Sequence, residues 1–145
     1  MRRVRRAVPG DAAALTSLMH ESTAYHGNYA RILDGYAVTA AQIEADVIYL
    51  AENDGVLSGF YSLTLTGEPE LDLMFVADSA QGTGLGALLF DHMKAEANRR
   101  GIAAVKIVSH PPSVGFYEKM GAVIIGTKPP TPTANWERPI LTLTV

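Results

Sequence analysis

Residues 70–89 read ELDLMFVADSAQGTGLGALL, a strand pattern followed by a loop and a helical pattern. The apolar run up to Val76 predicts a β-strand, and the leucine spacing after the loop predicts a helix. Gly82, Gly84 and Gly86 let the backbone of the loop approach a ligand closely. The unpaired amides of the first helical turn and the positive end of the helix dipole attract phosphate oxygens. This stretch therefore predicts a strand, a glycine loop and a helix start that together bind phosphate.

The glycine loop resembles the pyrophosphate motif of the GNAT superfamily of acyl-CoA-dependent N-acyltransferases. That motif reads Arg or Gln, two residues, Gly, one residue, then Gly or Ala, and Gln81, Gly84 and Gly86 match it. A second stretch, PPSVGFYEKMGA at 111–122, resembles the late helix motif of the same family, with a match over 116–121. Two motifs in the expected order are far more specific than either alone.

The resemblance implies that acetyl-CoA is the co-substrate and lies against the strand before the glycine loop. Backbone groups of Met74 and Val76 would hold the pantetheine arm and the thioester. The pyrophosphate would be held by the Gln81 side chain and by main-chain amides of Gly82, Thr83, Gly84, Leu85, Gly86 and Ala87. Ser113 stands where the family commonly has Ala, and His110 replaces the usual Asn or Asp that contacts the pantetheine arm.

The same resemblance makes Tyr117 the candidate general acid. A phenol is protonated at neutral pH, so it can hand a proton to the thiolate that leaves the thioester. An aromatic residue on a helix can equally belong to the hydrophobic core. The sequence therefore leaves a catalytic and a packing role open for this side chain.

Glu70 and Asp72 are the candidate bases that accept the proton of the amine, because many members of the family have a base or a water-positioning group at these two positions. Strand alternation predicts that both acids share a face with Met74 and Val76. A carboxylate is a poor base for an ammonium group unless burial raises its pKa or water relays the proton. The alternative is that both acids simply cap a solvated strand end.

The first helix and the loop after it commonly wall the acceptor site in this family. Here that region holds His20, Glu21, Tyr25, His26, Tyr29 and Tyr36. An aromatic and mildly acidic acceptor pocket is therefore one hypothesis, and surface residues without a ligand are its rival. The four histidines of the chain show no metal-ligand spacing, and His92 is expected at the boundary of the core.

The glycines also allow a dinucleotide interpretation, because Gly82, Gly84 and Ala87 satisfy a G-x-G-x-x-A fingerprint. A nicotinamide-binding domain would have an acid about 20 residues further on, at the end of the next strand. The next strand reads AAVKIVS, and no acid ends it. The fingerprint also lies past the midpoint of the chain and not after its first strand, so the acyl-CoA interpretation is favoured.

With 145 residues, 48% of them hydrophobic, the chain is expected to form one domain over 1–145. A net charge of −3 gives no sign of a nucleic-acid-binding surface, and the arginines at 2, 3, 5 and 6 are expected on an exposed edge strand.

The absence of cysteine excludes disulfides, thiolate metal sites and a cysteine nucleophile. No apolar run approaches the ~20 residues of a membrane span, so a cytoplasmic protein without membrane contact is expected.

The predicted elements follow the order β-α-α-β-β-β-α-β-α-β-β, an α/β (α+β mixed) pattern. An Asn-Asp-Gly tract at 53–55 is a strong hairpin signal. A helix with Thr39 as its N-cap is expected to carry Ile43 and Val47 on its inner face. Hairpins followed by a β-α-β crossover predict a mixed sheet with helices on both faces. The resemblance refines this to a GNAT-like, mostly antiparallel sheet of six to seven strands flanked by about four helices.

We therefore expect an N-acetyltransferase that moves an acetyl group from acetyl-CoA to a primary amine of a small molecule or protein, by direct attack in a ternary complex. The alternative is a non-catalytic acyl-CoA-binding sensor or regulatory module of the same fold. Acetyl-CoA and an amine acceptor are the expected partners, without nucleic acid, membrane or metal. A long proline-rich loop is expected over 128–139, followed by a last strand that reads ILTLTV. This strand and the loop could pair with a second copy in a homodimer, which no residue pattern decides.

Overall fold

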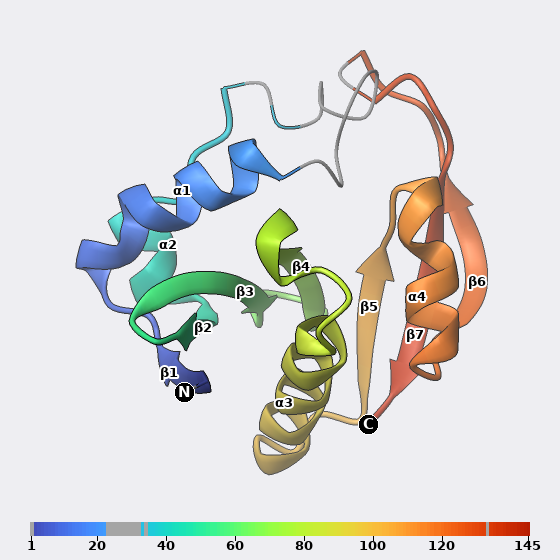
Figure 1. The fold of residues 1–145 in the computed structure, drawn as a ribbon. Coiled ribbons are helices and arrows are strands. Elements are labelled where there is room, and N and C mark those ends of the chain that lie inside the picture. Colours follow the sequence, from blue (N-terminus) through green and yellow to red (C-terminus); the bar gives the residue numbers. More distant parts are fainter. Residues whose placement is uncertain (1, 23–32, 34, 133) are drawn as a thin grey trace.

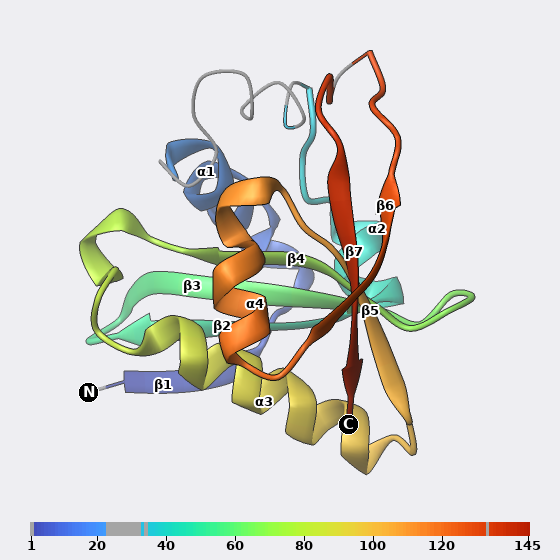
Figure 2. The same ribbon diagram turned by 90° about the vertical axis from the view of Figure 1, so that its right-hand side faces the viewer.

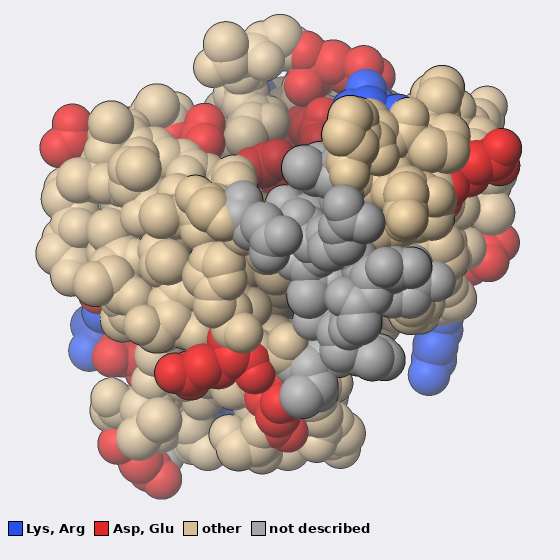
Figure 3. Space-filling view, turned by 90° about the horizontal axis from the view of Figure 1, so that it is seen from above, with Lys and Arg blue, Asp and Glu red and all other residues tan. Residues whose placement is uncertain are grey.

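The computed structural model describes residues 2–22, 33, 35–132 and 134–145, and the others are grey in Figure 1, Figure 2 and Figure 3. The strands are β1 (Arg2–Arg6), β2 (Val47–Asn53), β3 (Val56–Thr64), β4 (Glu70–Val76), β5 (Ala104–Val108), β6 (Val123–Lys128) and β7 (Arg138–Thr144). The helices are α1 (Ala12–Glu21), α2 (Ala40–Ala45), α3 (Leu85–Arg99) and α4 (Val114–Lys119). The 3-10 turns η1 (Pro9–Asp11), η3 (Asp78–Ala80) and η4 (Pro111–Ser113) precede α1, α3 and α4. No helix in these residues is long and apolar enough to cross a membrane.

The strands form one sheet in the order β1-β2-β3-β4-β5-β7-β6. Neighbouring strands are antiparallel except β4 and β5, which are parallel and are joined by the α3 crossover. α1 and α2 pack on one face of the sheet, and α3 and α4 pack on the other (Figure 1, Figure 2). The prediction of a mixed, mostly antiparallel sheet of six to seven strands with about four helices is confirmed.

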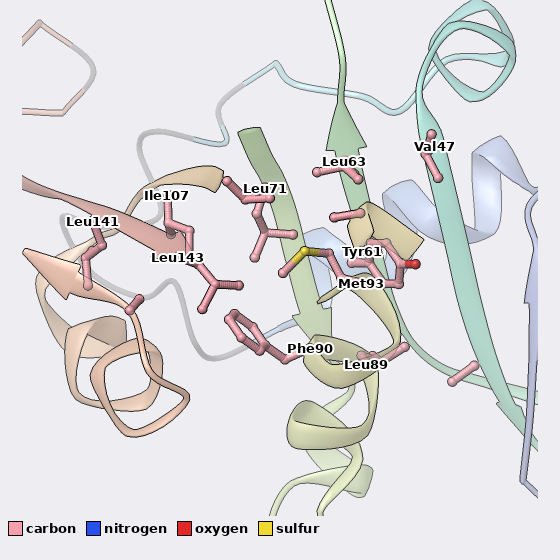
Figure 4. Packing of buried hydrophobic residues seen from close by; sticks show 14 of the residues in the cluster. Val47, Tyr61, Leu63, Leu71, Leu89, Phe90, Met93, Ile107, Leu141 and Leu143 are labelled. Atoms are coloured by element: carbon pink, nitrogen blue, oxygen red, sulfur yellow. The ribbon is translucent and has the colours of Figure 1, made fainter. Parts of the chain in front are cut away.

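The core on the α3 side forms because apolar residues of this helix recur every three or four positions. Leu89, Phe90 and Met93 are fully buried. Figure 4 shows Phe90 and Met93 among side chains of the sheet that include Leu71 and Leu143. Burial of one such side chain stabilises a fold by about 1.5–3 kcal/mol. The core therefore holds α3, and with it the glycine loop, firmly against the sheet.

Short-range signals are confirmed at a turn and at a helix start. Asp54 and Gly55 have φ of 51° and 81°, which are the positive values that a tight hairpin turn between β2 and β3 requires. The hydroxyl of Thr39 accepts a hydrogen bond from the Gln42 amide at 3.1 Å and caps α2. Both features depend on residues within a few positions of one another, which is why the sequence predicts them.

The placement of Val47 on the inner face of a helix is wrong, whereas the strand that the pattern VIYLAE predicts over 47–52 is confirmed. α2 ends at Ala45, and Asp46 after it is extended, so Val47 begins β2 opposite Leu63 of β3. A β-branched residue fits the pleated surface of a strand better than a helix. Pairing with β3 therefore decides the conformation of this residue.

The arginine cluster and His92 lie where the sequence predicts. β1 is an edge strand, and its Arg5 pairs with Asp11 and Glu52 at 2.9 Å each. The Nδ1 atom of His92 lies 2.7 Å from the Tyr61 hydroxyl at the boundary of the α3 core. These residues therefore have structural partners.

Candidate active site

β4 and β5 are neighbours in the sheet, but the described part of the two strands pairs only at its beginning. Glu70 lies opposite Lys106, and the Lys106 amide donates to the Pro69 carbonyl at 2.9 Å. Beyond this point the two ribbons diverge, as Figure 2 shows. Main-chain groups that face the gap have no ladder partner there, so they are available to bond a ligand.

β4 contains a β-bulge at Asp72. Leu71 lies opposite Leu63 of β3 whereas Leu73 lies opposite Ser62, so Asp72 is an extra residue on β4. Leu71 packs in the α3-side core and Leu73 in the α1-side core, although two residues spaced by two share a face in a regular strand. The bulge therefore changes the direction in which side chains of β4 point.

For Glu70, the prediction that it shares a face with Met74 and Val76 is wrong because of this bulge. Met74 and Val76 pack in the α3-side core together with Leu71. Glu70 directly precedes Leu71 and therefore lies on the opposite, α1 side of the strand. β4 thus presents Glu70 on one side and Met74 and Val76, the residues predicted to hold the pantetheine arm, on the other.

A cavity of about 250 Å³ lies along β4 where it separates from β5. Its walls include residues 70–75 of β4, residues 108–110 at and after the end of β5, and Leu33, Tyr36, Tyr117, Lys128 and Arg138. The structure thus brings the three predicted catalytic residues and His110 to one cavity.

A second cavity of about 220 Å³ lies between the glycine loop and α4. It is lined by Met74, Phe75, Val76, Gln81, Gly86, Pro112, Ser113, Phe116 and Tyr117. A Cβ on Gly86 would lie 3.5 Å from the ring of Phe116, an ordinary packing distance, so a side chain at this position would occupy space beside that ring. Met74, Phe75 and Tyr117 line both cavities, and an elongated ligand can therefore run from the loop past Tyr117 to the acids.

The glycine loop has the conformation of an anion site. Gly82 and Gly84 have φ of 76° and 83°, values that strain residues with a side chain. The first helical bond runs from the Leu88 amide to the Gly84 carbonyl at 3.1 Å. Amides of residues 85–87 therefore have no acceptor within the helix. The side chain of Leu85 is buried, so only its amide can contact a ligand.

Side chains of the loop bond to the protein itself. The Gln81 amide group donates to the Val76 carbonyl at 3.2 Å, and the Thr83 hydroxyl donates to the Ala80 carbonyl at 2.5 Å. Arg2 of β1 donates to the Thr83 carbonyl at 3.4 Å. The loop is therefore shaped by internal contacts before any ligand binds, and Gln81 must turn away from β4 to assist a phosphate.

The environment of Asp72 favours its protonated form. By surface area Asp72 is exposed, but protein atoms around its carboxyl displace water and raise its pKa, and the charges of Glu70 and Asp46 raise it further. Burial raises the pKa of Tyr36 as well, with a smaller contribution from the charge of Asp72. A carboxyl group with a raised pKa is a better proton acceptor than an ordinary one.

His110 lies in the segment between β5 and α4, and Tyr117 lies in α4 itself. The ring of Tyr117 packs against Phe116 and Phe90, with centroids 5.4 and 6.1 Å apart, and it also lines both cavities. His110 is 3% exposed, and its carbonyl accepts a bond from the Ser109 hydroxyl at 2.8 Å. The packing and cavity-lining roles of Tyr117 are therefore compatible.

Lys128 and Arg138 are site residues that sequence reasoning missed. They lie opposite each other where β6 ends and β7 begins, on either side of the proline-rich loop. Figure 3 shows acidic and basic atoms next to one another in a hollow of this face, beside the grey residues. The only feature of the sequence that could have indicated Lys128 and Arg138 is that each lies at the end of a strand next to the proline-rich loop.

The acceptor-wall hypothesis is supported at Tyr36, which lines the first cavity. The His20 ring lies 2.6 Å from the Tyr36 carbonyl and helps to position it. Tyr25, His26 and Tyr29 lie outside the described residues. Among the residues that are described, no group of three or more His, Asp or Glu side chains is placed to hold a metal ion.

Residues 25–128 match the family model described as an acetyltransferase (GNAT) domain. A curated relative, the 5-NmdU N-acetyltransferase of Pseudomonas phage PaMx11, is 32% identical over 82 residues, which are 54% of this chain and 59% of the relative. The matched part thus spans little more than half of that relative.

Solved structures share the fold over nearly their whole length. A GCN5-related N-acetyltransferase from Rhodopseudomonas palustris has a TM-score of 0.83 at 23% identity, covering 100% of this chain and 96% of that one. The PaiA N-acetyltransferase of Thermoplasma acidophilum, solved with coenzyme A, has a TM-score of 0.80 at 17% identity, with 100% and 99% covered. A Salmonella typhimurium acetyltransferase, solved with acetyl-CoA, has a TM-score of 0.76 at 20% identity, with 99% and 94% covered.

The sheet also argues against the nicotinamide interpretation, since dinucleotide-binding domains of that class have a doubly wound, mostly parallel sheet. Here the only parallel pair of neighbouring strands in the described residues is β4 and β5, which separate at the glycine loop. Both motifs, the fold and the match of the family model over 25–128 agree, and the chain belongs to the GNAT family of acetyltransferase domains.

Proposed function

We propose that this protein transfers an acetyl group from acetyl-CoA to a primary amine by direct attack in a ternary complex. The observation that carries the proposal is the gap between β4 and β5. It has the glycine loop at one end, Glu70 and Asp72 at the other, and Tyr117 between them. A thioester held at Tyr117 would therefore meet an amine held at the acids.

Acetyl-CoA would bind along β4. Amides of Gly82, Gly84 and residues 85–87 would hold the pyrophosphate, whereas the Thr83 amide, also predicted for this role, donates to the Ala80 carbonyl at 3.4 Å. Main-chain groups of Met74 and Val76 would hold the pantetheine arm, with Ser113 and His110 beside it. The complexes of the Thermoplasma and Salmonella structures with coenzyme A and acetyl-CoA support this assignment. Acetyl-CoA would thus supply the acyl group, and the protein would orient the thioester.

The reaction needs one proton removed and one proton delivered. The amine nitrogen attacks the thioester carbonyl, the bond from carbon to sulfur breaks, and the amine loses a proton to Asp72 or Glu70, directly or through water. The Tyr117 hydroxyl gives its proton to the departing thiolate and later regains one from solvent. Asp72 is the first candidate for the base, because loss of water around its carboxyl and the nearby charge of Glu70 raise its pKa.

Calorimetric titration with acetyl-CoA, CoA and NAD tests the cofactor assignment without a choice of acceptor. Micromolar binding of acetyl-CoA without binding of NAD is the expected result, followed by acetylation of members of an amine panel. Tight binding without turnover of any amine would favour the alternative, a non-catalytic acyl-CoA sensor. Absence of binding to both CoA forms would refute the proposal.

Gly84→Ala is expected to weaken acetyl-CoA binding about tenfold, because a hydrogen bond to a charged group contributes about 1.5–3 kcal/mol. Gly84 has a φ of 83°, where an L residue costs about 1–2 kcal/mol. The loop would shift to relieve this strain and would redirect its amides. The dissociation constant measured by calorimetry checks the prediction.

Gly101→Ala is the matched control, because Gly101 has a φ of 75° at the opposite end of α3. This variant should lose similar thermal stability and keep the wild-type affinity for acetyl-CoA. If both variants bind acetyl-CoA equally well, the loop does not hold the pyrophosphate.

The acceptor 5-NmdU is a second candidate, because the phage relative that is named for it shares 32% identity with this chain over 82 residues. It belongs in the amine panel beside small amines and protein amino groups.

The proposal also takes residues 1–145 as one domain acting in the cytoplasm. Light scattering would show whether the protein is a homodimer.

A further inference from the structure

The first cavity has walls of opposite charge. Glu70 and Asp72 lie on β4, whereas Lys128 and Arg138 lie across the cavity on β6 and β7. Among the described residues, none of these four side chains forms an ion pair with another. The cavity thus presents separate negative and positive groups to whatever enters it.

The guanidinium of Arg138 is incompletely bonded. Its Nε atom is buried and has no hydrogen-bond partner in the part of the chain that the structure describes. Arginine remains charged at any physiological pH, and a buried donor without an acceptor is costly. An acceptor atom is therefore expected beside Arg138 when the site is in use.

Lys128 strengthens this positive charge. Its Cα is in register with that of Arg138 on neighbouring strands. Like charges directly opposite each other on two strands destabilise their pairing. An anion bound between the two side chains would remove this repulsion, so the pair has the chemistry of an anion site at one end of the acceptor cavity.

We propose that the acceptor is a small primary amine that carries a carboxylate, with the carboxylate held by Arg138 and Lys128 and the amine by Glu70 and Asp72. The planar guanidinium matches the two oxygens of a carboxylate. A volume of about 250 Å³ suits a small molecule. This inference rests on the proposed acetyl transfer, and it names the class of substrate that the same site takes.

The test compares ω-amino acids of increasing length with their carboxamides, which have the same shape without the charge. Rates at saturating acetyl-CoA give kcat/KM, and calorimetry on the CoA-loaded protein gives amine affinity without turnover. The wild type is expected to favour an amino acid over its carboxamide at least tenfold, mainly through KM. In Arg138→Gln this ratio should fall about tenfold, and in Arg138→Lys it should fall less.

Arg3→Gln provides the matched control, since Arg3 is exposed on β1 at the other edge of the sheet. It should keep the wild-type ratio. A ratio near one in the wild type, while amines are acetylated, would overturn this inference and leave the acetyltransferase proposal intact. A ratio that Arg138→Gln does not change would overturn it too.

Aminoalkyl phosphates form a second arm of the panel. If they are favoured over the amino acids and depend on Arg138, the anion is a phosphate and the carboxylate assignment is wrong. If acetyl-CoA does not bind at all, the proposed function fails, and calorimetry on the protein without CoA then shows whether the amino acids bind in preference to their carboxamides. Absence of that preference would overturn the inference separately.

Discussion

Tyr117→Phe is expected to lower kcat about 10²- to 10³-fold while acetyl-CoA binding stays at the wild-type level. Tyr117 lines both cavities, and the variant removes its hydroxyl but keeps the ring that packs against Phe90 and Phe116. The thiolate must then leave without a proton donor. Release of CoA can be followed with a thiol reagent, because the chain has no cysteine to react.

Tyr49→Phe is the matched control for this measurement. It removes a hydroxyl that lies 3.5 Å from Glu96 of α3 and does not line the two cavities. Its kcat should equal that of the wild type. A Tyr117→Phe variant with undiminished kcat would show that Tyr117 serves only packing, and the general acid would then have to be another group or water.

Asp72→Asn is expected to lower kcat/KM about 10²-fold and to remove the rise of activity with pH that Asp72 produces. Loss of water and the nearby charge of Glu70 raise the pKa of Asp72 above its usual value. A base works only when it is deprotonated, so activity should be low below this pKa and should increase as pH rises through it. The pH profile of kcat/KM for both forms checks the prediction.

Ionisation of Asp72 as pH rises is expected to lower the stability of the fold, whereas it is expected to raise the activity. Because the pKa of Asp72 is higher in the folded state than in the unfolded chain, its contribution to stability is fully present below the unfolded pKa and is lost as pH rises through the folded one. Asp72→Asn should therefore stabilise the protein at neutral pH relative to the wild type, while it costs activity. Thermal unfolding at acidic and neutral pH measures this difference.

Asp91→Asn, on the exposed side of α3, is the control that removes the same charge away from the site. It should leave the activity profile unchanged. Glu70→Gln tests the second acid in the same way. If neither Asp72→Asn nor Glu70→Gln alters the pH profile, neither acid is the catalytic base, and both only cap the end of the strand.

Local sequence patterns predicted the elements well. The bounds of β4 agree with the prediction, the Asp54-Gly55 turn has positive φ, and Thr39 caps α2. Each of these features is set by residues within a few positions of one another, through backbone sterics or one hydrogen bond. The glycine loop before α3 belongs to the same class.

Register and distant neighbours could not be predicted in this way. The bulge at Asp72 exists only because β4 pairs with β3 while both of its faces pack on separate cores. Alternation within one strand contains no information about that partner, so the side to which Glu70 points was predicted wrongly. Pairing with β3 likewise decided that Val47 belongs to a strand and not to the helix before it.

The sequence by itself determined the order of the elements, the glycine loop and the family, because these depend on local patterns and on motifs that are contiguous in the chain. Only the tertiary structure decided which charges share the acceptor cavity. Lys128 and Arg138 line the same cavity as Glu70 and Asp72 because the sheet places β7 and β6 beyond β5. That neighbourhood follows from how strands far apart in the sequence pack together, and no local pattern of residues contains it.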